Sequence, residues 1–168
     1  GSEVVSIRRR EPLRRALNVP RAFFSKRGLA AFHAASAERR SATLRELSTP
    51  SYPVGSAWDD PVRAAEREGR FRVAPSPNGS DQVIAATGFQ QGFRHDPLLA
   101  DLVDTHDLPT HDRWIVLASD STVAELTDEM RTLSIAGVAA QWAFPAADTI
   151  AGAKYAAHAF RRHVCRTR

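Results

Sequence analysis

The stretch Gln82-Val83-Ile84-Ala85-Ala86-Thr87-Gly88-Phe89 decides how this chain is expected to fold. Its first six residues are mostly small or β-branched and a glycine follows them. We therefore predict a buried strand over 82–87 that ends at Gly88. The preceding segment, 75–80, contains Asn78-Gly79, a pair typical of a hairpin turn. Before that turn, residues 70–74 alternate polar and apolar side chains and predict another strand.

Upstream, the chain begins with a short β-branched run, 3–7, which we predict to be a strand. Arg8-Arg9-Arg10-Glu11-Pro12 follows it directly, and the proline disfavours further pairing. Residues 20–47 are helical in character, with Gly28 as the expected break. Residues 48–61 hold three prolines and predict a connecting loop, and 61–68 predicts a short helix closed by Gly69.

Downstream of Gly88, residues 97–103 predict a short helix, 114–118 a strand and 133–138 a third buried strand. The chain ends in a predicted helix over 148–163, with Asp148 as its N-cap. One apolar stripe follows the period of this helix and is expected to be its packed face; its members are Ile150, Ala153, Ala157, Phe160 and Val164. Gly152 weakens a helix by roughly 1 kcal/mol relative to alanine, which indicates a close contact at that position.

Taken in this order, the segments resemble the second half of flavoprotein monooxygenases of the flavin-containing and Baeyer–Villiger types. In that family, a strand similar to 83–89 returns the chain from the NADPH domain to the FAD domain. The resemblance implies an α/β chain with a partial Rossmann-like, dinucleotide-binding fold in two incomplete lobes. Residues 1–81 would be the C-terminal part of an NAD(P)-binding-like domain, and 82–168 the C-terminal part of an FAD-binding-like domain.

The resemblance also implies cofactor-binding residues in the first lobe and at the crossover. Arg9 matches the arginine that holds the 2′-phosphate of NADPH in that family, and Arg10 adjoins it. A guanidinium suits this role because its forked donors match a phosphate. The alternative interpretation of the same residues is a solvated basic turn. Thr87 and Gly88 match the family's domain crossover.

In the second lobe, residues 145–155 resemble the FAD-facing helix of the family. The match places Asp148, Thr149 and Ile150 nearest the isoalloxazine, at a helix N-terminus whose N–H groups suit electron-rich atoms. Gly137 matches a glycine that many relatives follow with an aspartate near the cofactor. This chain has Val138 there instead. The alternative interpretation is a C-terminal helix that only packs on its neighbours.

Neither cofactor has its usual phosphate loop here. No two of the 9 glycines are separated by a single residue, so Gly-x-Gly-x-x-Gly is absent. We therefore expect part of an FAD- and NADPH-dependent, monooxygenase-like oxidoreductase acting on a small molecule. This part should be inactive alone, should not retain FAD or NADPH, and should need a missing N-terminal half or self-association. The alternative is a non-catalytic relic or split-half module for binding or assembly.

The bulk composition favours a globular chain and excludes several classes. The formal net charge is +4, and the excess of basic residues lies before residue 46. No nucleic-acid motif accompanies these arginines, and no apolar run is long enough for a membrane helix. Cys165 is the only cysteine, so an internal disulfide is impossible and a cytoplasmic location is expected. The histidines follow no metal-binding spacing, and we expect no metal site. The start at Gly1-Ser2, with Met130 as the only methionine, suggests a processed or partial chain.

Overall fold

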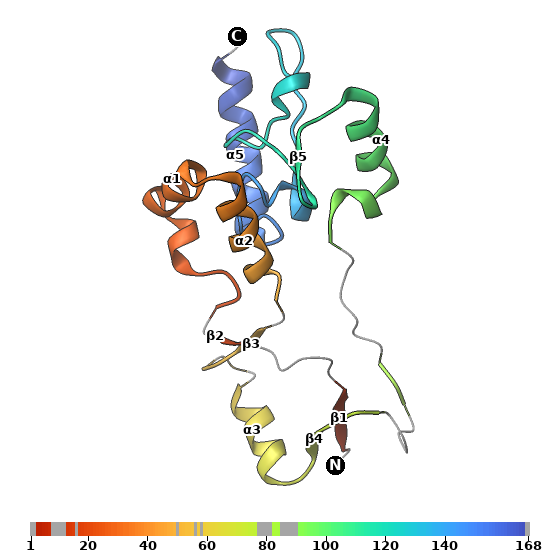
Figure 1. Cartoon of the computed structure of the whole chain (residues 1–168). Coiled ribbons are helices and arrows are strands. Elements are labelled where there is room, and N and C mark those ends of the chain that lie inside the picture. Colours follow the sequence, from red (N-terminus) through yellow and green to blue (C-terminus); the bar gives the residue numbers. More distant parts are fainter. Residues whose placement is uncertain are drawn as a thin grey trace. The chain divides into compact units, whose positions relative to one another are not determined.

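The structure is a computed structural model, which describes residues 3–7, 13–15, 17–49, 51–55, 57, 59–76, 82–84 and 91–166. The chain is mixed α/β (Figure 1). Its contacts divide it into two compact units: unit 1 comprises 1–18 and 49–88, and unit 2 comprises 19–48 and 89–168. The sequence predicted a different division, with the boundary between the two lobes between residues 81 and 82. The grouping differs because segment 19–48 packs with the C-terminal part of the chain. The assignment of the lobes to NAD(P) and FAD stays a prediction.

Unit 1 contains two pairs of parallel strands. β1 (Val4–Ile7) pairs with β4 (Phe71–Ala74), so that Val4 lies opposite Phe71 and Ile7 opposite Ala74. β2 (Leu13–Arg15) pairs with β3 (Ser51–Pro53). The strands predicted at 3–7 and 70–74 are confirmed. β3 lies inside the segment that was expected to be only a connecting loop, and short parallel pairing explains how its proline is accommodated.

Helix α3 (Asp59–Arg67) precedes β4 and begins two residues before the predicted start. Its first residue, Asp59, is only 3% exposed. The carboxylate of Asp59 accepts hydrogen bonds from the Gly55 N–H at 3.0 Å and from the Arg63 Nε at 3.0 Å. The chain leaves the helix through Gly69 at a φ of +69°, the left-handed conformation that favours glycine. The predicted helix and its glycine stop are confirmed.

Unit 2 is mostly helical, and side-chain oxygens cap its α-helices. Ser25 and Ser36 accept from the backbone N–H groups of Gly28 and Arg39, and Asp96 accepts from those of Leu98 and Leu99. The α-helices are α1 (Lys26–Ala34), α2 (Ala37–Leu47), α4 (Pro97–His106) and α5 (Ile150–Arg166). The short elements are η1 (Arg21–Phe24), η2 (Phe93–His95), β5 (Thr110–His111), β6 (Trp114–Ile115), η3 (Ala124–Leu126) and η4 (Gly137–Ala140).

Gly28 does not break the 20–47 segment, so that prediction is wrong. It lies in the first turn of α1, where the preceding turn η1 comes very close. A Cβ on Gly28 would lie 2.0 Å from the carbonyl oxygen of Ala22. The actual break lies between α1 and α2, at Ala35 and Ser36, where the backbone is extended.

Two of the predicted buried strands are wrong where the structure describes them. Residues 82–84 form no strand, and Val83 and Ile84 are 65% and 89% exposed. The rest of that segment, 85–90, lies outside the described residues. In 133–138, Ser134 forms a single bridge with Thr122, after which the chain turns into η4 at Gly137. The strand expected at 114–118 shortens to the two residues of β6, which pair with β5 in a hairpin.

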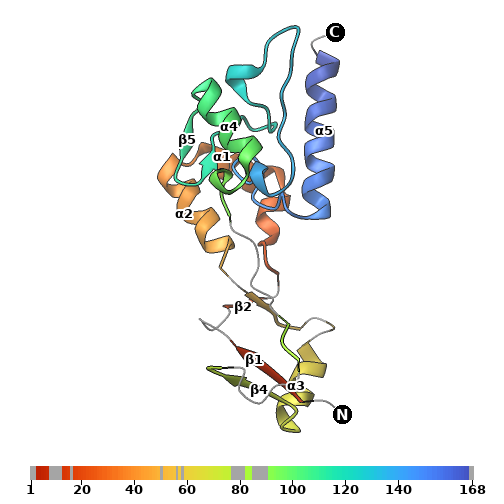
Figure 2. The same cartoon turned by 90° about the vertical axis from the view of Figure 1, so that its right-hand side faces the viewer.

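Helix α5 does not pack with the predicted face. Gly152, Ala156 and Ala159 are buried, whereas Ile150 is 81% and Phe160 43% exposed. The predicted apolar stripe therefore points outward. Small side chains allow the backbone of α5 to come closer to the rest of unit 2 than the larger residues would. Figure 2 shows α5 along one flank of this unit.

Candidate functional site

The turn that enters α5 forms the centre of unit 2. All residues from Gln141 to Ala147 are buried, and Trp142 is 1% exposed. At the end of this turn, the Thr149 hydroxyl donates to the Ala146 carbonyl at 2.7 Å and accepts from the Gly152 N–H at 3.1 Å. Thr149 is therefore the capping residue of α5, and the prediction that Asp148 has this role is wrong. The exposed carboxyl of Asp148 lies one residue too early.

Gly152 allows α5 to lie directly on this turn. A Cβ at this position would lie 2.4 Å from the Ala146 carbonyl oxygen and 2.5 Å from both Cα and the carbonyl oxygen of Ala147. All three neighbours are backbone atoms, which cannot move aside as a flexible side chain can. The predicted close contact at Gly152 is confirmed.

One turn further along α5, Tyr155 joins two loops. Its ring stacks on Phe144, with centroids 4.4 Å apart and planes inclined by 9°. Its hydroxyl donates a hydrogen bond to the carbonyl oxygen of Ser119. Burial raises the pKa of the Tyr155 hydroxyl further above neutral pH. The stack and the hydrogen bond together fix the first two turns of α5.

Two side chains from α1 and α2 hold the other side of the buried turn. The Nε2 of His33 lies 2.7 Å from the Ala143 carbonyl oxygen, and Arg40 donates to the Trp142 carbonyl. The Arg40 guanidinium lies 5.0 Å from the centre of the Phe32 ring and 4.2 Å from the Trp142 ring. Nothing in the sequence distinguished Arg40 from the many solvated arginines around it, because its role depends on a contact 102 residues away.

A polar cluster holds the far half of α5. The Asp120 carboxylate accepts from the hydroxyl of Thr122 at 2.6 Å and from its N–H at 3.2 Å. It lies 3.5 Å from the Nδ1 of His163. Burial raises the pKa of Asp120, but the two Thr122 donors and His163 outweigh that effect and hold it below its ordinary value. Asp120 is therefore charged at neutral pH and ties the 119–122 loop to α5.

The structure brings three of the predicted site residues together and leaves four outside its description. Arg9, Arg10, Thr87 and Gly88 do not belong to the described residues. Asp148, Thr149 and Ile150 lie together at the N-terminus of α5; the Asp148 and Ile150 side chains are exposed. Thr149 is engaged as a cap, so its hydroxyl already has two partners.

Gly137 has a conformational role that the structure does show. It begins η4 at a φ of +71°, with open space where a Cβ would lie. Glycine is favoured there because of the positive φ rather than because another group comes close. Contact between Gly137 and a cofactor stays a prediction.

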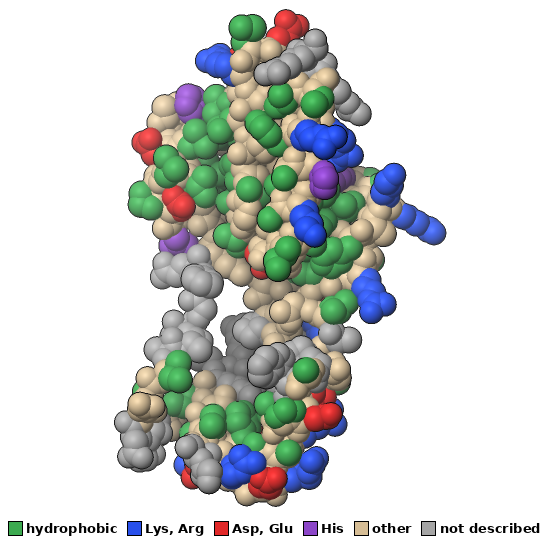
Figure 3. Space-filling view, turned by 180° about the vertical axis from the view of Figure 1, so that it is seen from behind, with side chains coloured by type: hydrophobic (Ala, Val, Ile, Leu, Met, Phe, Trp, Pro, Cys, Tyr) green, Lys and Arg blue, Asp and Glu red, His purple; other side chains and the backbone are tan. Residues whose placement is uncertain are grey.

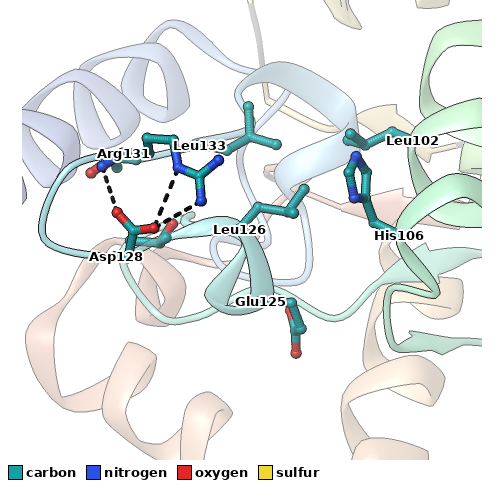
Figure 4. A pocket seen from close by; sticks show the side chains of 9 residues that line it. Leu102, His106, Glu125, Leu126, Asp128, Arg131 and Leu133 are labelled. Carbon is teal, nitrogen blue, oxygen red and sulfur yellow. Dashed lines mark hydrogen bonds and ion pairs between the residues drawn. The ribbon is translucent and has the colours of Figure 1, made fainter.

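An open pocket of about 360 Å³ lies between α4 and the 125–133 loop (Figure 4). Leu102, Leu126 and Leu133 form its apolar part. Asp128 accepts from the backbone N–H groups of Met130 and Arg131 and pairs with the Arg131 side chain. The Met130 and Arg131 donors lower the pKa of Asp128. Asp128 and Arg131 thus pair with each other within the loop, and His106 and Glu125 also line the pocket.

Within the described ranges, His, Cys, Asp and Glu side chains nowhere gather into a group of three that could bind a metal ion. The same ranges contain no helix with the length and apolar character needed to cross a membrane. Comparison with known proteins found no matching protein family, no matching curated protein and no matching solved structure.

Proposed function

We propose that this chain supplies the C-terminal parts of an FAD- and NADPH-dependent oxidoreductase of the flavoprotein monooxygenase kind. Arg9 and Arg10 would bind the 2′-phosphate of NADPH, and the N-terminus of α5 would face the flavin. A bound flavin would supply the redox chemistry by accepting a hydride from NADPH. The single cysteine, which cannot form an internal disulfide, is compatible with the cytoplasmic location included in this proposal.

The parallel pairing of β1 and β4 is the observation that carries the proposal. Parallel neighbours require a crossover connection, and here α3 lies on that connection directly before β4. In parallel α/β sheets, ligands bind beyond the carboxyl ends of the strands. β1 ends at Ile7, and the arginines at 8–10 follow it in the sequence. Their place in the sequence, directly after a parallel strand, supports a role in binding phosphate.

The N-terminus of α5 offers a second point of support. Helix N-termini carry partial positive charge and suit electron-rich atoms of a ligand. Ile150, the first residue of α5, is 81% exposed, and the turn behind it is held by Thr149 and Gly152. The chain has no glycine-rich phosphate loop, so its own grip on FAD or NADPH should be weak.

A comparison of two nucleotides tests the proposed role of Arg9. Adenosine 2′,5′-bisphosphate and adenosine 5′-monophosphate differ only in the 2′-phosphate, and NMR titration can detect even millimolar binding. A charge-assisted contact is worth about 1.5–3 kcal/mol, so we expect about tenfold or greater preference for the bisphosphate. Arg9→Ala should remove the preference. Arg27→Ala, which changes an exposed arginine of α1, should leave it unchanged. Equal affinity of the unsubstituted chain for the two nucleotides would contradict the proposal.

A non-catalytic binding or assembly module is the second candidate, and exposed apolar side chains of unit 1 favour it. Val4, Ile7 and Val73 on the β1–β4 pair are 46–54% exposed, and Val83 and Ile84 are more exposed still. Exposed apolar strands invite further pairing. A partner that supplied a further strand or a covering helix would bury them.

A further inference from the structure

Helix α5 presents to solvent an apolar stripe with a basic border. The stripe consists of Ile150, Ala153, Ala157, Phe160 and Val164; the first four are exposed and Val164 is half-buried. With 3.6 residues per turn, the stripe lies about 110° round the helix from Gly152, Ala156 and Ala159. Lys154 and Arg161 lie beside it and are exposed, and the sequence of α5 contains no Asp or Glu. Figure 3, which views the chain from behind Figure 1, shows hydrophobic, basic and histidine side chains side by side on this part of unit 2.

Charge argues against two copies of this stripe packing on each other. Such a contact would bring two sets of basic side chains together without any acidic residue from either helix, and like charges at an interface are unfavourable. An apolar stripe of this kind therefore calls for a partner surface that is both apolar and acidic.

Helix α4 of the same chain has that chemistry on its outward face. Leu98 is 75% exposed, and Asp101 and Asp104 are exposed on the same helix, which contains no Lys or Arg. Arg94 pairs with Asp104, whereas Asp101 projects from the middle of the helix. Figures 1 and 2 show α4 and α5 apart from each other in unit 2, so one chain cannot pair its own two helices.

We propose that the stripe of α5 docks on α4 of a second copy of this chain. Phe160 covers Leu98, while Arg161 faces Asp101 and Lys154 adds to the basic border of the contact. Two different surfaces meet in this contact. If each of two chains places its α5 on the α4 of the other, a closed symmetric dimer results. If only one such pair forms between two chains, the contact is heterologous and continues from chain to chain. Because charged side chains border the contact, added salt should weaken it. The proposal does not depend on any cofactor role of the chain.

Sedimentation velocity over a dilution series gives the first test. We expect concentration-dependent association, with Phe160→Asp raising the dissociation constant at least tenfold. Met130→Asp is the matched control, since it places the same charge on a side chain that is 90% exposed and belongs to neither helix. Far-UV circular dichroism of both variants shows whether they are folded. A monomer at every concentration, or association that Phe160→Asp leaves unchanged, overturns the proposal.

A charge exchange between two variants tests the pairing itself. Asp101→Arg alone and the double variant Lys154→Glu, Arg161→Glu alone should each associate at least fivefold more weakly than the unsubstituted chain. Mixed together, the reversed α4 of the first should bind the reversed α5 of the second and restore association. Failure of the mixture to recover overturns the α4–α5 pairing. Binding to anionic lipid vesicles that Phe160→Asp abolishes, without self-association, would show that the stripe serves a membrane surface instead.

Discussion

Replacing Gly152 with alanine tests how α5 is seated on the buried turn. In an exposed helix, Gly→Ala stabilises by about 1 kcal/mol. Here the new Cβ would lie 2.4–2.5 Å from backbone atoms of Ala146 and Ala147, so α5 would have to retreat by about 1 Å to reach an ordinary contact of 3.4 Å. Overpacking of this kind costs about 1–3 kcal/mol, and rigid backbone neighbours place the cost at the upper end. We expect a net loss of about 2 kcal/mol.

Urea unfolding measures this loss. Trp142 is buried in unit 2, and a Trp58→Phe background removes the tryptophan of unit 1 from the fluorescence signal. A loss of about 2 kcal/mol lowers the midpoint by roughly 1 M, given a slope of about 2 kcal/mol/M. Ala157→Gly is the control on the exposed face and should cost about 1 kcal/mol through helix propensity alone. A raised or unchanged midpoint for Gly152→Ala would refute the close approach.

Two further substitutions test the contacts that hold α5. Tyr155→Phe keeps the ring stack but removes the hydrogen bond to the Ser119 carbonyl. It should lower the free energy of unfolding by about 1 kcal/mol in the same assay. An unchanged free energy of unfolding would show that water replaces the bond. Asp120→Asn should destabilise unit 2 by about 1 kcal/mol at pH 7, because the charge that Thr122 and His163 favour is lost. The folded-state pKa of Asp120 is lowered, so its contribution is complete above the unfolded value of about 3.9 and disappears as the pH falls through the folded value. The two proteins should therefore converge in stability at low pH, and a constant difference down to pH 2 would contradict this assignment.

The local elements of this chain could be predicted because their signals are local. Strands 4–7 and 71–74 have β-branched or alternating residues, and the helix at 59–67 has an acidic start and a glycine stop. Helix α5 was expected from its period, and the close contact at Gly152 from the cost of glycine in a helix. The cofactor assignment of Arg9 and Gly88 remains a prediction from resemblance, since these residues lie outside the described part of the chain.

The orientation of α5 shows why the period of a helix does not determine its packed face. The sequence contains two faces, one with Ile150 and Phe160 and one with Gly152, Ala156 and Ala159. Hydrophobicity alone favours the first. In the tertiary structure the second face is buried, because a buried turn fills the space beside α5 and only glycine and alanine leave room for the backbone of that turn. Which face of α5 is buried therefore depends on the side-chain volume that its neighbour, the buried turn, can accommodate. The sequence of the helix does not reveal that neighbour.

The sequence by itself determined most of the helices, the strands at 4–7 and 71–74, and that no glycine-rich phosphate loop is present. It did not determine which segments pack together. The helices of residues 19–48 belong with the C-terminal unit because His33 and Arg40 bind carbonyls of the buried turn at Ala143 and Trp142. A buried carbonyl requires a donor, but any of many arginines or histidines could supply it. Only the folded backbone brings one particular pair within hydrogen-bonding distance.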